Sequence, residues 1–335
     1  MAEVDYPAIL EAAWQQHLAP REPDAPTVVS LFAGCGGSSL GYSMAGFREL
    51  LAVEWDDNAV ETFKLNFPGV PVYHGDIAKL SVEECLSLTG LEPGQLDVLD
   101  GSPPCQGLST AGKRVLDDPR NSLFREYVRL LQGLRPRVFV MENVSGMVKG
   151  KMKLVFAEAM RELKASGYKV SARLMNAMYF HVPQSRQRLI FIGVREDVGR
   201  EPSHPKAESG IFGVAFPGTR TEAERIPEHK VRVALAHKAR HEAAGHGFGY
   251  QILSADKPAP TWPKTMMVST SAPRYVERGV HWLASPVEMS AIGSYPTAFR
   301  FAGTYEDQWT RIGNSVPPLF MRAIARHIRQ ELLTP

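Results

Sequence analysis

The stretch 27-TVVSLFAGCGGSSLGY-42 decides the fold. Residues 27–34 read as a buried strand that runs into a glycine-rich turn, and a helix follows the turn. Glycines let the backbone adopt positive φ and pass close to a ligand, and the amino end of a helix receives polar or charged groups. The stretch therefore predicts a strand–turn–helix unit with a ligand at the turn.

Strand and helix signals continue to alternate after this unit. Helices are expected at residues 58–67, 122–134 and 153–166. Further strands are expected at residues 49–55, 70–76, 95–104, 137–144, 168–176 and 188–195. This alternation is typical of an α/β fold, a doubly wound and mostly parallel sheet with helices on both faces. Helices at residues 7–19 and 317–333 are expected at the two ends of the chain.

The amino-acid composition changes at about residue 196, where Pro, Gly and His become frequent. Residues 200–283 hold 12 Lys and Arg against 8 Asp and Glu, together with six of the ten histidines. This basic segment predicts a smaller, irregular and loop-rich domain. An irregular insertion with no binding role is the alternative interpretation.

Composition excludes several classes of protein. The 335 residues are 44% hydrophobic with a net charge of +2, which allows a nucleic-acid partner without requiring one. Three cysteines argue against a disulfide framework, and none has zinc-ligand spacing, so no metal is expected. The N-terminus lacks the features of a secretory signal, and no apolar run could span a bilayer. A soluble cytoplasmic protein is therefore expected.

Two acidic residues follow neighbouring strands. Glu54 ends the second strand, about 20 residues after the turn, and Asp76 ends the third. Ligands bind at the carboxyl ends of the strands in such a sheet, and a carboxylate at this spacing can accept hydrogen bonds from both ribose hydroxyls. A nucleoside cofactor is therefore predicted. Ser39 occupies the third glycine position of the dinucleotide fingerprint, which disfavours a nicotinamide cofactor.

A cysteine follows the fourth strand in 101-GSPPCQGLSTAGKR-114. Pro103 and Pro104 stiffen the loop, and a thiol presented at a ligand crevice suits a nucleophile. The alternative is an inert cysteine. Glu142 ends the fifth strand, and 184-QSRQR-188 starts another, where alternation is expected to point Gln184, Arg186 and Arg188 to one side. A thiol, a carboxylate and arginines are thus expected to converge beside the cofactor.

Six motifs occur in a fixed order along the chain: FAGCGG, GDI, GSPPCQGLS, ENV, QSRQR and IGNSVPP. Together they resemble the ordered motif set of the C5-cytosine DNA methyltransferases. The resemblance covers about residues 27–195 and 281–335. It implies a fold of the S-adenosylmethionine-dependent methyltransferase type, with S-adenosyl-L-methionine as the methyl donor. The cofactor-binding residues that it implies are Phe32, Gly34, Gly36, Glu54, Trp55, Asp76, Ile77, Pro104, Leu123, Asn314 and Ser315.

The resemblance also implies a catalytic set of Cys105, Glu142, Arg186 and Arg188. The Cys105 thiolate would add to carbon 6 of a flipped-out cytosine, so that carbon 5 becomes nucleophilic. Glu142 would hold ring nitrogen 3 and the exocyclic amine, and Arg186 would steady Glu142 or the base. The expected DNA contacts are Gln106, Ser109, Lys113, Arg114, Lys264, Arg274 and Arg278.

The expected domains follow from the motif positions. Residues 1–195 and 305–335 would form the catalytic domain, residues 196–290 the target-recognition domain, and residues 291–304 a hinge. The C-terminal helix would return to pack beside the cofactor loop. Two places depart from the family pattern: Leu108 replaces the usual Phe, and 285-SPVEMSAIGSYP-296 lacks the residues that usually brace the recognition domain.

The implied substrate is double-stranded DNA, methylated by a monomer in the bacterial cytosol or nucleoid, and a cognate restriction endonuclease is an open question. The sequence does not identify the target bases. Three alternatives remain: an RNA cytosine methyltransferase of the same fold, a catalytically silent DNA-binding module, and a nicotinamide-dependent oxidoreductase.

Overall fold

The computed structural model describes residues 5–104, 119–150, 152–208, 220–245, 250–254 and 256–334, with side chains from residue 123 in the second range. A seven-stranded sheet in the order β3-β2-β1-β4-β5-β7-β6 forms its centre. The strands are β1 (Thr27–Leu31), β2 (Arg48–Glu54), β3 (Val72–His74), β4 (Val98–Gly101), β5 (Val138–Val144), β6 (Tyr168–Asn176) and β7 (Gln187–Arg195). Strands β1 to β5 pair in parallel, whereas β7 runs antiparallel to both neighbours.

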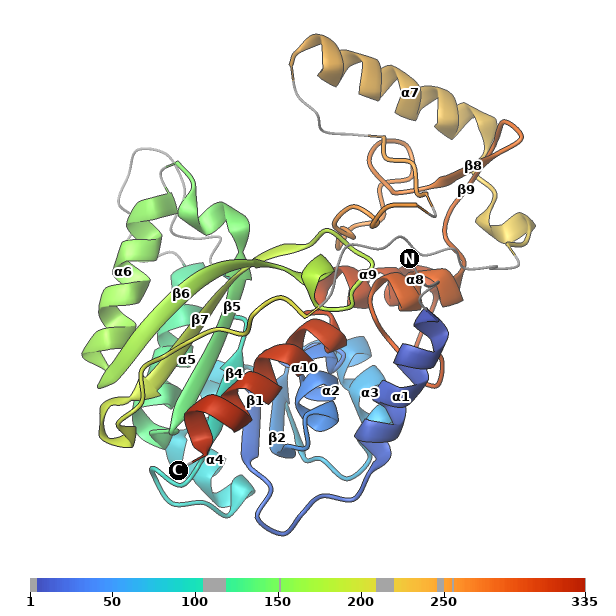
Figure 1. Cartoon of the computed structure of the whole chain (residues 1–335). Helices are drawn as coiled ribbons and strands as arrows, with labels where there is room; N and C mark the ends of the chain where they lie inside the picture. The colour runs from blue at the N-terminus through green and yellow to red at the C-terminus, as the bar shows by residue number, and fades with distance from the viewer. Residues whose placement is uncertain are drawn as a thin grey trace.

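Helices cover both faces of this sheet (Figure 1). One face carries α1 (Tyr6–Leu18), α2 (Gly37–Met44), α3 (Asp57–Asn66) and α10 (Pro318–His327). The other carries α4 (Val82–Thr89), α5 (Pro119–Leu134) and α6 (Met152–Ala165). Neighbouring strand residues alternate between the two cores: Val138 packs on one side and Phe139 on the other. The predicted doubly wound, mostly parallel fold is confirmed.

The basic middle segment is less regular. It holds α7 (Glu228–Ala243) and the hairpin of β8 (Tyr275–Glu277) and β9 (Val280–Trp282), which extend away from the sheet in Figure 1. The helices α8 (Pro286–Ile292) and α9 (Tyr305–Asn314) then lead the chain back to α10. None of the described helices is both long and apolar enough to cross a membrane.

Helix α10 packs directly on α2, the helix that follows the glycine turn. A Cβ atom added at Gly41 would lie 2.6 Å from Cβ of Met321 and 2.7 Å from the carbonyl oxygen of Pro318. Only glycine lets the two backbones approach this closely. The end of the chain therefore supports the first strand–turn–helix unit.

Candidate active site

The turn between β1 and α2 has the backbone shape that its glycines predicted. Gly34 and Gly36 have φ of 56° and 93°, and Phe32 also has a positive φ of 56°. Positive φ is unfavourable for a residue as bulky as Phe, and such strain gathers at functional sites. Apart from chain neighbours, a Cβ on Gly34 would meet no atom within 4 Å, so the space above this turn is open.

Glu54 holds the turn to the end of β2. Its Oε2 accepts a hydrogen bond of 2.7 Å from the Gly34 amide. Its Oε1 accepts bonds of 2.9 Å and 3.0 Å from the amides of Trp55 and Asp56. Backbone amides therefore fix the carboxylate at the carboxyl edge of the sheet. Oε1 already accepts two hydrogen bonds, whereas Oε2 has a second lone pair for a further donor.

The residues around Glu54 lie where a flat ligand could rest. Trp55 is 76% exposed, which is unusual for so large an apolar side chain. β2 pairs with β3 so that Glu54 lies opposite His74, which brings the exposed Asp76 to the same edge. The Asp76 carboxylate caps the short helical turn after β3 by accepting from the Ala78 amide at 3.0 Å.

The other predicted cofactor residues differ in exposure. Ile77 is buried, Leu123 is half-buried against the same core, and Pro104 is exposed. Asn314 is exposed at the end of α9. Ser315 follows it and lies against α2, because a Cβ on Gly37 would be 3.0 Å from Ser315 Cβ.

The second half of the site lies at the ends of β4 and β5. The Asn143 side chain donates to the Pro103 carbonyl at 3.1 Å and holds the start of the proline turn. The predicted nucleophile and four predicted DNA contacts lie outside the described residues: Cys105, Gln106, Ser109, Lys113 and Arg114. Beside the turn, Arg188 Nε and Glu142 Oε1 form an ion pair at 2.6 Å, with side chains 13% and 12% exposed.

The structure corrects the role predicted for Arg186. Its Nη1 donates to the Trp262 carbonyl at 3.1 Å and its Nη2 to the Gly313 carbonyl at 2.9 Å. Burial, and then the charge of Arg188, lower the pKa of Arg186 to about 9. β7 begins only at Gln187, so strand alternation does not extend back to Arg186. Arg188 therefore pairs with Glu142, whereas Arg186 fastens the sheet to the middle and C-terminal segments.

Gln184 shares this joining role. It is buried, donates to the Ile292 carbonyl at 3.2 Å, and accepts from the Trp262 amide at 2.9 Å. With Arg186 it connects β7 to the middle segment by hydrogen bonds to main-chain groups. Main-chain groups exist at every position, so the sequence offered no signal for this arrangement.

The three candidate DNA contacts that the structure describes differ in exposure. Lys264 and Arg278 are exposed. Arg274 is fully buried, donates to the carbonyls of Ala272 at 3.1 Å and Val268 at 2.8 Å, and lies 4.7 Å from the centre of the Tyr250 ring. Arg274 is a packing residue of the middle segment, and its prediction as a DNA contact was wrong.

One ion pair near the turn was not predicted from the sequence. Arg311, in α9, donates to both carboxylate oxygens of Asp56, at 2.7 Å and 3.2 Å. Asp56 follows directly on Trp55, so the pair holds the exposed ring's backbone against the C-terminal segment. The pairing of a residue just before IGNS with one just after β2 is visible only in three dimensions. Across the described ranges, no three His, Cys, Asp or Glu side chains group as metal ligands.

Comparison with known proteins places this geometry in a family. The family model for the C-5 cytosine-specific DNA methylase matches residues 26–330. The Type II methyltransferase M1.HphI of Haemophilus parahaemolyticus is 33% identical over 334 residues, covering 90% of this chain and 86% of the relative. M.XorII of Xanthomonas oryzae pv. oryzae, also a Type II methyltransferase, is 30% identical and covers 92% and 85%.

Solved structures share the fold. A mutant of Spodoptera frugiperda DNMT2 superposes with a TM-score of 0.71 at 18% identity, covering 92% of this chain and 100% of that one. The family model covers most of the sequence, including every strand that builds the site. The chain therefore belongs to the C-5 cytosine-specific DNA methylase family and is a DNA (cytosine-5)-methyltransferase.

Proposed function

We propose that the chain methylates a cytosine, flipped out of a specific short sequence in double-stranded DNA, through a covalent bond between Cys105 and carbon 6. The observation that carries the proposal is the Glu142–Arg188 ion pair beside the proline turn that leads into Cys105. A carboxylate held by a guanidinium is suited to bind the polar edge of a base. A target inside a duplex is out of reach, so the base must leave the helix.

The chemistry follows from these groups. The Cys105 thiolate forms a bond to carbon 6, and electron density moves to carbon 5 and ring nitrogen 3. Glu142 binds nitrogen 3 and the exocyclic amine, and Arg188 fixes the carboxylate. Carbon 5 takes the methyl group, and the electron pair of the broken methyl–sulfur bond stays on the donor's sulfur. The carbon-5 proton then leaves to a base, and the bond between the Cys105 sulfur and carbon 6 breaks. This last step restores the aromatic ring and the thiolate.

S-adenosylmethionine supplies the methyl group as an electrophilic sulfonium when bound. Three features support its fit at the turn. The space over Gly34 is open, Trp55 offers an exposed ring, and Oε2 of Glu54 keeps a lone pair for a ribose hydroxyl. Phe32 and Asp76 would bind around the adenine. These residues position the nucleoside and leave the chemistry to the sulfonium carbon.

The domain roles form part of the proposal. Residues 1–195 and 305–335 would carry out catalysis, residues 196–290 would recognise the target, and residues 291–304 would link the two. Lys264 and Arg278 remain candidate DNA contacts because both are exposed. Arg186 would join the two parts, since its guanidinium bonds to the Trp262 carbonyl inside the proposed recognition segment and to the Gly313 carbonyl in the C-terminal catalytic segment.

The relatives' names support a narrower role, modification within a Type II restriction–modification system. A protein of this kind would protect DNA against an endonuclease that cuts the same sequence. Incubating plasmid with the enzyme and then challenging it with a panel of Type II endonucleases tests this role. Selective protection against one of them would support it, and sequencing the modified cytosines would identify the target.

Transfer of labelled methyl groups from S-adenosylmethionine to undermethylated plasmid and, in parallel, to bulk tRNA tests the activity. We expect label in DNA with the wild type and with Cys85→Ala, and none with Cys105→Ala. A duplex with 5-fluorocytosine at the target tests the covalent step, because fluorine cannot leave carbon 5 as the proton does. The adduct should survive denaturant and require Cys105. Label in tRNA alone would overturn the DNA substrate, and labelling by Cys105→Ala would overturn the mechanism.

A further inference from the structure

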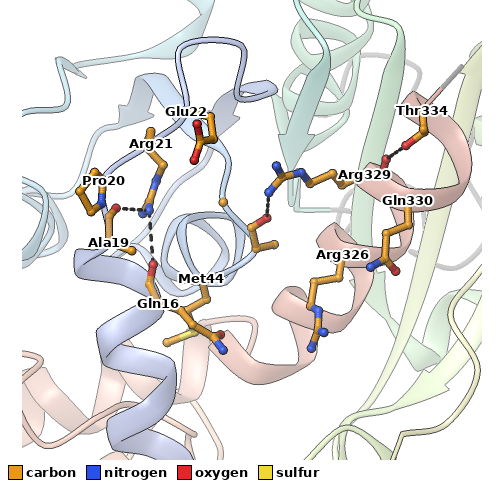
Figure 2. Close-up of a pocket in the computed structure, with 12 residues that line it drawn as sticks. Gln16, Ala19, Pro20, Arg21, Glu22, Met44, Arg326, Arg329, Gln330 and Thr334 are labelled. Carbon is orange, nitrogen blue, oxygen red and sulfur yellow. Dashed lines mark hydrogen bonds between the residues drawn. The ribbon is translucent and has the colours of Figure 1, made fainter.

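A cavity of about 530 Å³ lies at the opposite edge of the sheet from the candidate active site. It is bounded by the residues after α1, the end of α2 and the C-terminal helical segment. Figure 2 shows Arg21 on one side and Arg326 and Arg329 on the other. The chain passes this cavity before it enters β1, whose far end carries the glycine turn. The cavity is therefore separate from the proposed cofactor site.

Positive charge in this cavity is not balanced. Arg21, Arg326 and Arg329 line it, with Glu22 as the single acidic side chain of the lining. Within the described part of the chain, none of the three arginines forms an ion pair. A concave surface lined by charge of one sign concentrates ions of the opposite sign.

Arg21 is fixed in place by uncharged acceptors. Its Nε donates to the Phe47 carbonyl at 3.1 Å, and its Nη2 donates to the His17 carbonyl at 2.7 Å. Its Nη1 donates to the carbonyls of Gln16 and Ala19, and its Nη2 also donates to the Ser43 hydroxyl. These acceptors use all five N–H groups but carry no formal charge, so Arg21 gives the cavity positive charge and no free donor. Burial, and then the charge of Arg329, lower the pKa of Arg21, so two guanidinium groups are held within each other's electrostatic influence.

Arg329 is also held in position. Its Nη1 donates to the Ala45 carbonyl at 3.0 Å and lies against Gly46, where an added Cβ would be only 2.3 Å away. Gly46 has φ of 83°, so glycine serves both the turn and the close approach of the guanidinium. Arg326 is exposed and bonds to no residue that the structure describes. The charges of Arg21 and Arg329 are thus fixed in position, whereas that of Arg326 is not.

We propose that this cavity binds a small ligand that carries two or more phosphate groups. The guanidinium groups of Arg326 and Arg329 keep N–H donors whose planar geometry matches phosphate oxygens, and the Arg21 charge in the same cavity favours a ligand that is itself multiply charged. The volume is that of a site for a nucleotide-sized molecule. Met44, Ala45 and Pro20 add an apolar surface to the lining. The inference stands apart from the proposed reaction because it requires neither DNA nor the methyl donor.

Isothermal titration of the full chain with inorganic pyrophosphate, at constant ionic strength and without divalent metal, tests the proposal. Arg326→Gln should weaken binding about tenfold, the effect of losing one charge-assisted hydrogen bond. It should not change the melting temperature, because Arg326 is exposed. Arg232→Gln, which changes an exposed arginine of α7, is the matched control and should bind within about twofold of wild type.

Two results would overturn the proposal. The first is an absence of pyrophosphate binding, or equal affinities for Arg326→Gln and Arg232→Gln, which would locate any binding elsewhere. The second comes from a parallel titration with a short duplex. If Arg326→Gln left pyrophosphate binding unchanged but lowered DNA affinity and its salt dependence, the cavity would belong to a DNA-binding surface.

Discussion

Two carboxyl groups lie between the sheet and α2, the buried Asp100 and the half-buried Glu49. Asp100, in β4, is 3% exposed and accepts a hydrogen bond of 3.4 Å from the Tyr42 hydroxyl. Glu49, in β2, accepts from the Ser39 hydroxyl at 2.8 Å, and its Oε2 is buried with no hydrogen-bond partner. Neither carboxyl forms an ion pair within the described residues. Such an environment disfavours the charged form of both groups.

Burial raises the pKa of Asp100 to about 8, with a smaller contribution from Glu49, and burial raises the pKa of Glu49 to about 7. Both values exceed those of the unfolded chain, about 4. Each group therefore contributes stability that is fully present below pH 4 and is lost as pH rises through the folded pKa. For one carboxyl the loss is about 1.4 kcal/mol per pH unit within that window.

The perturbation that isolates this effect is Asp100→Asn, because an amide of the same shape cannot ionise. The free energy of unfolding of the variant, minus that of wild type, should rise by about 3 kcal/mol between pH 5 and pH 7. Urea unfolding at pH 5, 6 and 7, followed by circular dichroism, measures it. Taking the difference between the two free energies of unfolding cancels the contribution of every group that titrates alike in both proteins.

Asp24→Asn is the control, because Asp24 is exposed and its difference from wild type should not change with pH. A constant difference for Asp100→Asn would show that Asp100 does not bind a proton on folding. A difference that falls with pH would show that the folded state stabilises the carboxylate, and would refute the reasoning.

Three further predictions concern the cofactor turn, the helix contact and the half-buried His17. Glu54→Gln should weaken S-adenosylmethionine binding about 10- to 100-fold by titration calorimetry without DNA, whereas Glu61→Gln, an exposed change in α3, should not. Gly41→Ala should lower the free energy of unfolding by about 1–3 kcal/mol because its Cβ would clash with α10; Gly69→Ala has open space and should have little effect. Burial, more than a neighbouring arginine, lowers the pKa of His17 to about 4, below its unfolded value, so its contribution to stability is lost as pH falls. Wild type should therefore lose about 1.4 kcal/mol per pH unit relative to His17→Gln between pH 6 and pH 4, in the same urea assay.

Most of the strands were predictable because they hold a short apolar run that ends near a glycine, a proline or a charge. β1, β5 and β6 lie within their predicted ranges, and helices α1, α3 and α6 begin and end one residue early. α7 was not predicted, because a helix that buries only Val231 and Ala234 shows almost no apolar periodicity. The prediction of an irregular middle segment was therefore incomplete, because it did not include this helix.

The site was predictable in its residue types but not in its pairings. Which arginine of 184-QSRQR-188 reaches Glu142 depends on where β7 begins, and a shift of one residue would turn each side chain to the other face. The burial of Arg274 depends on Tyr250 and on carbonyls of its own loop. A sequence pattern records that a charge is present but not which partner neutralises or surrounds it.

The contact between α2 and α10 has a consequence for how the protein is made. On the ribosome, residues 27–44 emerge early, but the surface that covers their helix is encoded about 280 residues later. The first helical layer stays incomplete until α10 has been synthesised, and contacts this distant in sequence form slowly. A nascent chain that stops before residue 318 would expose the side of α2 that α10 covers. We expect such chains to bind chaperones and to be degraded early, because the surface of α2 that α10 normally covers would be open to both.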